Sequence, residues 1–187
     1  KMKTLVIHPQ DKSTDFLSPI YAGLDDVTLV TRGWTVNQVR EAIQTHDQVM
    51  MMGHGSPNGL FAVGQFPIDY PHSSHIIGAS MVEALSQKDN NIFIWCNADQ
   101  FVNKHGLKGF YSGMFVSEVG EAFYCGVKTF DQTSVDESND TFARQLGECL
   151  LATRAPEEIF DQIRDQYGLL AEVNAIAEYN HQRLYLK

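Results

Sequence analysis

Two reactive side chains follow apolar segments of the chain and are of the types that serve as nucleophile and base. Cys96 ends the apolar run at 92–96 (IFIWC), and His54 closely follows the run at 48–52 (QVMMM). A thiolate is a strong nucleophile, and an imidazole nearby can take the thiol proton. The chemistry expected of this pair is acyl transfer, with a thioester formed on a peptide or amide and then hydrolysed by water.

The neighbours of this pair are also of types that such a reaction uses. Gly55 follows His54 directly and allows the backbone to approach a substrate closely. The backbone N–H groups of Gly55 and Cys96 are candidate donors to the oxyanion of the transition state. Ser56 is expected to cap or orient the loop, and Asn97 is a candidate for a hydrogen bond at the site.

The elements that must position these residues alternate between short apolar runs and helical patterns. Strands are expected at 4–8, 27–31, 48–52, 92–96 and 111–116, with a hairpin excursion at 60–70. Helices are expected at 14–24, after the capping pair Thr35 and Gln38, and at 73–85, 98–105, 117–124, 139–152, 156–167 and 170–182. This alternation predicts an α/β fold, a three-layer sandwich with a mainly parallel sheet. Residues 1–187 are expected to form one domain, with a helical C-terminal part over about 139–187.

The fold predicts that the two reactive residues lie at the same edge of the sheet. The 42 residues from position 54 to position 96 allow one crossover connection. Strands joined in this way run parallel, and ligand sites in open α/β sheets lie at the carboxyl ends of such strands. We therefore expect His54 and Cys96 to face one another across the loops.

The segments MMMGHGS and FIWCNAD resemble the motifs of the clan CD cysteine peptidases, which include caspases, legumains, gingipains, clostripains and separases. In element order the resemblance covers roughly residues 3–127. It implies a caspase-like fold and a cysteine peptidase or related amide hydrolase that needs no cofactor. It also implies His54 as general base, Cys96 as nucleophile, Gly55 as oxyanion donor, and a peptide or protein as substrate.

Two other functions stay open. Trp95 stands where members of this family usually have a small residue, so a catalytically inactive binding or regulatory domain on the same fold is the main alternative. For Cys96 alone, the competing interpretation is a buried structural thiol. A flavodoxin-like ligand binder is the third choice. It ranks last because the first loop (HPQDKSTDF) has acidic residues where a phosphate cradle is expected, and these would repel a phosphate.

Composition excludes several other classes. The net charge is −9 and no basic cluster occurs, which argues against nucleic acid and anionic membrane surfaces as partners. No apolar run approaches the length of a transmembrane helix. The three cysteines match neither a disulfide framework nor a zinc motif, so a reducing cytoplasm is expected. Nothing in the sequence predicts an oligomeric state.

The remaining histidines do not predict a metal site. His72 and His75 lie three residues apart, but no third ligand accompanies them. His8 ends the first predicted strand and is either a bystander or a substrate contact at the same sheet edge. We therefore expect neither a metal nor a cofactor.

Overall fold

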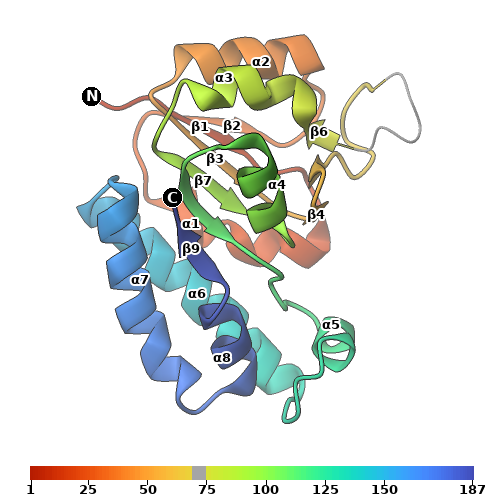
Figure 1. Ribbon diagram of the computed structural model, residues 1–187, viewed down its shortest axis with the longest axis vertical. Helices are drawn as coiled ribbons and strands as arrows, with labels where there is room; N and C mark the ends of the chain where they lie inside the picture. The colour runs from red at the N-terminus through yellow and green to blue at the C-terminus, as the bar shows by residue number, and fades with distance from the viewer. Residues whose placement is uncertain (69–74) are drawn as a thin grey trace.

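The computed structural model describes residues 1–68 and 75–187. Its centre is a six-stranded sheet in the order β2-β1-β3-β7-β8-β9. The strands are β1 (Thr4–Ile7), β2 (Val27–Val30), β3 (Gln48–Met52), β7 (Asn91–Ile94), β8 (Gly109–Ser112) and β9 (Leu184–Leu186). All neighbours pair in parallel except β8 and β9, which pair antiparallel. The fold is therefore α/β with a mixed, mostly parallel sheet (Figure 1).

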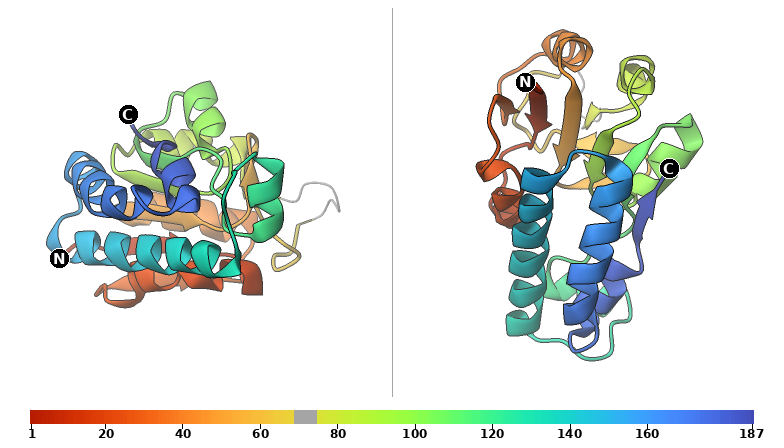
Figure 2. Two further views of the ribbon diagram at one scale, coloured as in Figure 1. Left: turned by 90° about the horizontal axis from the view of Figure 1, so that it is seen from below. Right: turned by 90° about the vertical axis from the view of Figure 1, so that its left-hand side faces the viewer.

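Helices cover both faces of this sheet. One face carries α2 (Val36–Thr45), α3 (Val82–Ser86) and α4 (Ala98–His105), and the other carries α1 (Pro19–Ala22), α6 (Gln132–Ala152), α7 (Pro156–Ala171) and α8 (Ala175–His181). Because side chains alternate across a strand, Met51 enters the first core while Met50 and Met52 enter the second. The layers are visible in the side views of Figure 2. Strands covered in this way are apolar at successive positions, as β3 is.

A second, three-stranded antiparallel sheet follows the end of β3. It consists of β4 (Gly55–Ser56), β5 (Gly59–Phe61) and β6 (His75–Ile77). The predicted helix at 73–85 is therefore wrong over 75–77, where Ile77 pairs with Leu60 and both are buried. Helical structure begins only with the short 3-10 helix η2 (Ala79–Met81) and continues in α3. Positions 73 and 74, and His72, lie outside the described residues.

Several local predictions are confirmed. Thr35 and Gln38 form the reciprocal capping box at the start of α2. The helix predicted at 98–105 is α4, and Gly106 ends it in the left-handed conformation, with φ of 64°. By contrast, the single helix predicted at 14–24 is wrong: the segment forms the 3-10 helix η1 (Lys12–Leu17) and then α1, which Pro19 begins.

Other boundaries differ from the prediction. The fifth strand lies at 109–112 instead of 111–116, and the helix expected at 117–124 is α5 (Val119–Tyr124), with Glu118 at its N-cap position. Helix α6 begins at 132, because Asp131 and Ser134 form a capping box. Strand β9 was not predicted from the sequence at all. None of the helices over residues 1–68 and 75–187 is both long enough and apolar enough to cross a membrane.

Candidate functional site

The sheet brings His54 and Cys96 to one pocket. Strands β3 and β7 are parallel neighbours, with Met52 opposite Ile94 at their carboxyl ends. His54 and Cys96 each follow one of these ends by two residues and line the same small pocket, together with Phe115. The expected adjacency of the two strands is thus confirmed, and both reactive residues lie at the edge where the fold rule places a site.

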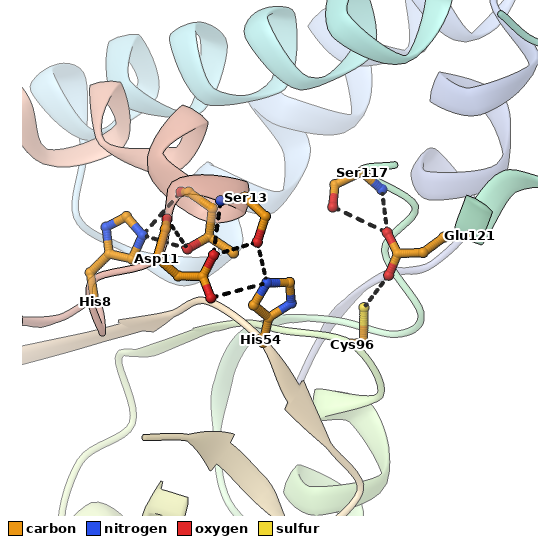
Figure 3. A network of polar contacts seen from close by, with 8 residues as sticks. His8, Asp11, Ser13, His54, Cys96, Ser117 and Glu121 are labelled. Carbon is orange, nitrogen blue, oxygen red and sulfur yellow. Dashed lines mark hydrogen bonds and ion pairs between the residues drawn. The ribbon is translucent and has the colours of Figure 1, made fainter. Parts of the chain in front are cut away.

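His54 is held by two residues at the start of the 3-10 helix η1, its cap Asp11 and Ser13 in its first turn. Its Nε2 lies 2.5 Å from Ser13 Oγ and 3.9 Å from Asp11 Oδ2. Asp11 in turn accepts hydrogen bonds at Oδ1 from Ser13 Oγ (2.6 Å) and from Ser13 N (2.9 Å). These two bonds from Ser13 lower the pKa of the Asp11 carboxyl, because they stabilise its charged form. The three side chains form one connected cluster (Figure 3).

This cluster defines the tautomer of a neutral His54. An ionised carboxylate only accepts hydrogen bonds, so the Ser13 hydroxyl proton points to Asp11. The serine oxygen must then accept from His54, which places the ring proton on Nε2. The second ring nitrogen, Nδ1, keeps a free lone pair and lies on the side of the ring toward Cys96 (Figure 3). A base with this orientation can take a proton from the pocket.

His8 supports the 3-10 helix η1, which carries Ser13. Its Nε2 donates to the backbone oxygen of Thr14 (3.0 Å), and its Nδ1 lies 2.8 Å from the hydroxyl of Tyr21. Burial lowers the pKa of His8, which favours the neutral ring. The sequence suggests that His8 is either a bystander or a substrate contact. Its hydrogen bonds show a structural role instead, because they hold the first turn of η1, in which Ser13 and Thr14 lie.

The Cys96 thiol is hydrogen-bonded away from His54. Its Sγ donates to the backbone oxygen of Phe115 at 3.2 Å and lies 3.9 Å from Glu121 Oε2. Burial, and next the negative charge of Glu121, raise the pKa of the thiol to about 12. No hydrogen bond joins Cys96 to His54 within the described parts of the chain. The thiol is therefore protonated at neutral pH in this arrangement.

Ser117 fixes the carboxylate that faces this thiol. Glu121 Oε1 accepts from Ser117 N at 3.0 Å and from Ser117 Oγ at 3.2 Å. With one oxygen held in this way, the other is directed at the sulfur of Cys96 (Figure 3). The negative charge beside the thiol is thus part of a fixed local structure.

Three residues proposed near the site directly follow His54 and Cys96 in the chain but do not appear among the described residues that line this pocket. Gly55 and Ser56 form β4, where the Ser56 hydroxyl accepts from Asn58 N at 3.0 Å and so orients the loop. Asn97 adopts the left-handed conformation, with φ of 66°, and its N–H donates to Gly113 O at 3.1 Å. Its backbone N–H is therefore already used, whereas the adjacent Cys96 N–H has no acceptor within the described residues.

Trp95 explains why glycine stands next to His54. The indole is 1% exposed and packs between Phe93 and Phe101 in the core. A Cβ on Gly55 would lie 2.1 Å from Trp95 Cδ1, so only glycine fits there without movement. Trp95 Nε1 also donates to the backbone oxygen of Ser56 at 3.0 Å. The bulky residue before Cys96 therefore supports the loop that carries His54.

The sequence did not lead us to Asp11, Ser13, Phe115 or Glu121. For Asp11 and Ser13 a signal existed, because they follow the carboxyl end of β1, the neighbour of β3 at the same sheet edge. The Phe115 carbonyl and Glu121 are placed by tertiary packing, for which the sequence carries no local pattern. Within residues 1–68 and 75–187, no three His, Cys, Asp or Glu side chains come together as a possible metal site.

Comparison with known proteins gives no relative: no family model, no curated protein and no solved structure matches the chain.

Proposed function

We propose that this protein is a cysteine-dependent hydrolase of peptide or amide bonds, a divergent member of the caspase-like peptidases, with His54 as base and Cys96 as nucleophile. The observation that supports this most strongly is the common pocket of the two residues at the carboxyl ends of the neighbouring strands β3 and β7. A thiol and an imidazole in one pocket are the minimal equipment for acyl transfer.

In the proposed reaction, His54 Nδ1 takes the proton of the Cys96 thiol while the sulfur attacks the carbonyl carbon of the substrate. The new C–S bond forms, and the carbonyl oxygen becomes an oxyanion that the free N–H of Cys96 can stabilise. The C–N bond then breaks, and the leaving amine takes the proton from His54. Water hydrolyses the thioester with His54 again as base, which returns the thiol and releases an acid.

The proposal requires that the thiol leaves its resting hydrogen bonds. Sγ must turn from the Phe115 oxygen toward the His54 ring. The contact between the thiol and the Glu121 carboxylate must also be broken, so that the thiol proton can pass to His54. Catalytic hydrogen bonds are often long or absent without substrate and form in the complex. The protein alone is therefore expected to have an unreactive thiol, and substrate binding is expected to bring Cys96 and His54 together.

Cleavage of a peptide library tests the proposal. The native chain is expected to cleave a subset of the peptides, whereas Cys96→Ala and His54→Ala are expected to lose this activity. Cys125→Ala is a matched control, because it removes another half-buried thiol that does not line the pocket. Cleavage that persists in Cys96→Ala would rule out the thiol as nucleophile.

The second candidate is a non-catalytic binding or regulatory domain. It is favoured by the raised pKa of Cys96 and by the hydrogen bonds that direct the thiol away from His54. An electrophilic peptide, such as a chloromethyl ketone, separates the two functions. Covalent labelling of Cys96 that depends on both the peptide sequence and His54 supports the hydrolase, and sequence-dependent binding without labelling supports the binding domain.

A further inference from the structure

The segment 115–117 carries both contacts that hold the Cys96 thiol. Phe115 provides the backbone oxygen that accepts from Sγ, and Ser117 fixes Glu121. The segment lies between β8 and α5 and belongs to no strand or helix. Its backbone must therefore find hydrogen-bond partners elsewhere, because buried peptide groups are costly to leave unpaired.

Asn180 of α8 supplies these partners. Its Oδ1 accepts from Val116 N at 2.7 Å, and its Nδ2 donates to Val116 O at 2.9 Å. Both residues are fully buried. The amide thus pairs with both peptide groups of Val116, as a neighbouring strand would. Asn139 of α6 adds a bond from Nδ2 to Ser117 O at 2.9 Å.

We infer that Asn180 is a positioning residue for the Cys96 thiol, which it controls through Val116 and the two flanking residues of the segment. Both bonds of Asn180 to the segment end on the residue between Phe115 and Ser117, and its amide also contacts the hydroxyl of Tyr167. The inference deepens the proposed function, because it assigns control of that function's nucleophile to the C-terminal helices. It makes the reactivity of the thiol depend on a residue 84 positions away in the chain.

Other groups that face the thiol belong to the same region. Glu118, Glu121 and Cys125 act on the charge of Cys96 from α5 and its ends, and Tyr179 of α8 lies near both cysteines. His54 faces the pocket from the β3 side. Loss of Asn180 is expected to release segment 115–117, admit water and move the oxygens of Phe115 and Glu121 away from the sulfur. The entry of water and the greater distance of the Glu121 charge both favour the thiolate, because burial and Glu121 are the two main causes of the raised pKa.

The test is the pH dependence of Cys96 alkylation by iodoacetamide, followed on the full chain by peptide mass spectrometry. Asn180→Ala removes both bonds, and Asn180→Leu removes them while keeping a similar side-chain volume and adding no charge. Asn174→Ala is the matched control. It removes a buried asparagine that caps the same helix and bonds Ser134 O at 2.9 Å, away from the segment.

Both Asn180 variants are expected to lower the pH of half-maximal alkylation by about one unit or more, which is roughly tenfold in rate at a fixed pH. Asn174→Ala is expected to lose stability without this change. An unaltered profile in folded Asn180 variants, or an equal change in Asn174→Ala, would overturn the inference. If Asn180→Ala does not fold, Asn180→Leu and Asn139→Ala decide, since Asn180→Leu keeps the volume of the side chain and Asn139→Ala removes one bond to the segment. Absence of peptide cleavage by the native chain would count against the proposed function and leave this result intact.

Discussion

The two sides of the pocket differ in how they treat their reactive group. On the imidazole side, His54 and Asp11 keep about a third of their side-chain surface exposed and are linked through one hydroxyl, that of Ser13. On the thiol side, Cys96 is enclosed, faces a carboxylate and has a pKa of about 12. The base is therefore in a usable tautomer, whereas the nucleophile is kept protonated.

The two sides also depend on different parts of the chain. The imidazole side is built by the ends of two adjacent strands, β1 and β3, within the first 54 residues. The thiol side depends on segment 115–117, which is fixed from helices α6 and α8. The difference indicates that the reaction is controlled at the thiol, and that helices α6 and α8, which are distant from Cys96 in sequence, can provide this control.

The largest effect is expected in the free energy of unfolding at alkaline pH, compared between the native chain and Cys96→Ser. The pKa of Cys96 is raised from 9.0 in the ordinary thiol to about 12 in the fold. The contribution of the neutral thiol to the free energy of unfolding is fully present below pH 9. It is lost as the pH rises from 9 to 12, because only the unfolded thiol ionises in that window. The total loss is about 4 kcal/mol, of which about 2 kcal/mol has occurred by pH 10.5.

Denaturant unfolding at pH 8 and pH 10.5 measures this loss. Cys96→Ser is expected to lack it, because a serine hydroxyl does not ionise in this range, and it can still donate to Phe115 O. Cys125→Ser keeps Cys96 and is therefore expected to keep the loss. Equal alkaline destabilisation of the native chain and Cys96→Ser would show that the thiol is not held protonated, and the contrast between the two sides would disappear.

A second prediction concerns the contact between Gly55 and Trp95, where the imidazole side and the thiol side of the pocket meet. In Gly55→Ala the new Cβ would lie 2.1 Å from Trp95 Cδ1 and 2.8 Å from Gly59 O. Because Gly55 follows His54 and Trp95 precedes Cys96, relief of this clash displaces both reactive residues. We expect a loss of about 1–3 kcal/mol in the free energy of unfolding, measured by denaturant titration.

Gly120→Ala is the control for this substitution. Gly120 lies in α5, where no other element of the described residues comes within 4 Å of an added Cβ, so alanine is expected to stabilise the helix by about 0.5–1 kcal/mol. Equal stability of Gly55→Ala and the native chain would show that the loop can yield, and that Trp95 does not fix the position of His54.

The same contrast marks the limit of prediction from sequence. The parallel strands, the capping box at Thr35 and the common edge of His54 and Cys96 follow from local patterns and from the topology of α/β sheets. The sequence predicts helix where β6 lies, because the few residues of this strand gain their conformation only from pairing with β5. The partners of the thiol could not be predicted, since Phe115 contributes a backbone oxygen and Glu121 is placed by packing.

The third prediction removes charge from the thiol side. Glu121→Gln keeps an oxygen for Ser117 and abolishes the negative charge, so the pKa of Cys96 is expected to fall. The fall is expected to be about one pH unit, because burial, the larger cause, remains. The measurement is again the pH of half-maximal alkylation. Glu118→Gln is expected to have a smaller effect, since Glu118 contributes less to the raised pKa. A profile that moves to higher pH in Glu121→Gln would contradict this assignment.

The smallest effect is expected on the imidazole side, in Ser13→Ala. This variant keeps the backbone N–H that Asp11 accepts and loses the hydroxyl, so the pKa of Asp11 is expected to rise toward its ordinary value of 3.8. The lowered pKa stabilises the fold above pH 3.8, and this contribution is lost as the pH falls through the folded value. NMR titration of the Asp11 carboxyl measures the change, and the loss of stability at neutral pH is expected to be about 1 kcal/mol.

Ser13→Thr is the control for this last variant, because it retains the hydroxyl and is expected to titrate as the native chain does. A native Asp11 titration in Ser13→Ala would mean that the hydroxyl is not bonded to the carboxylate. Its proton would then be free to point at His54 Nε2, and the ring proton would move to Nδ1. The imidazole would face Cys96 as a donor, and neither side of the pocket would be prepared to remove the thiol proton.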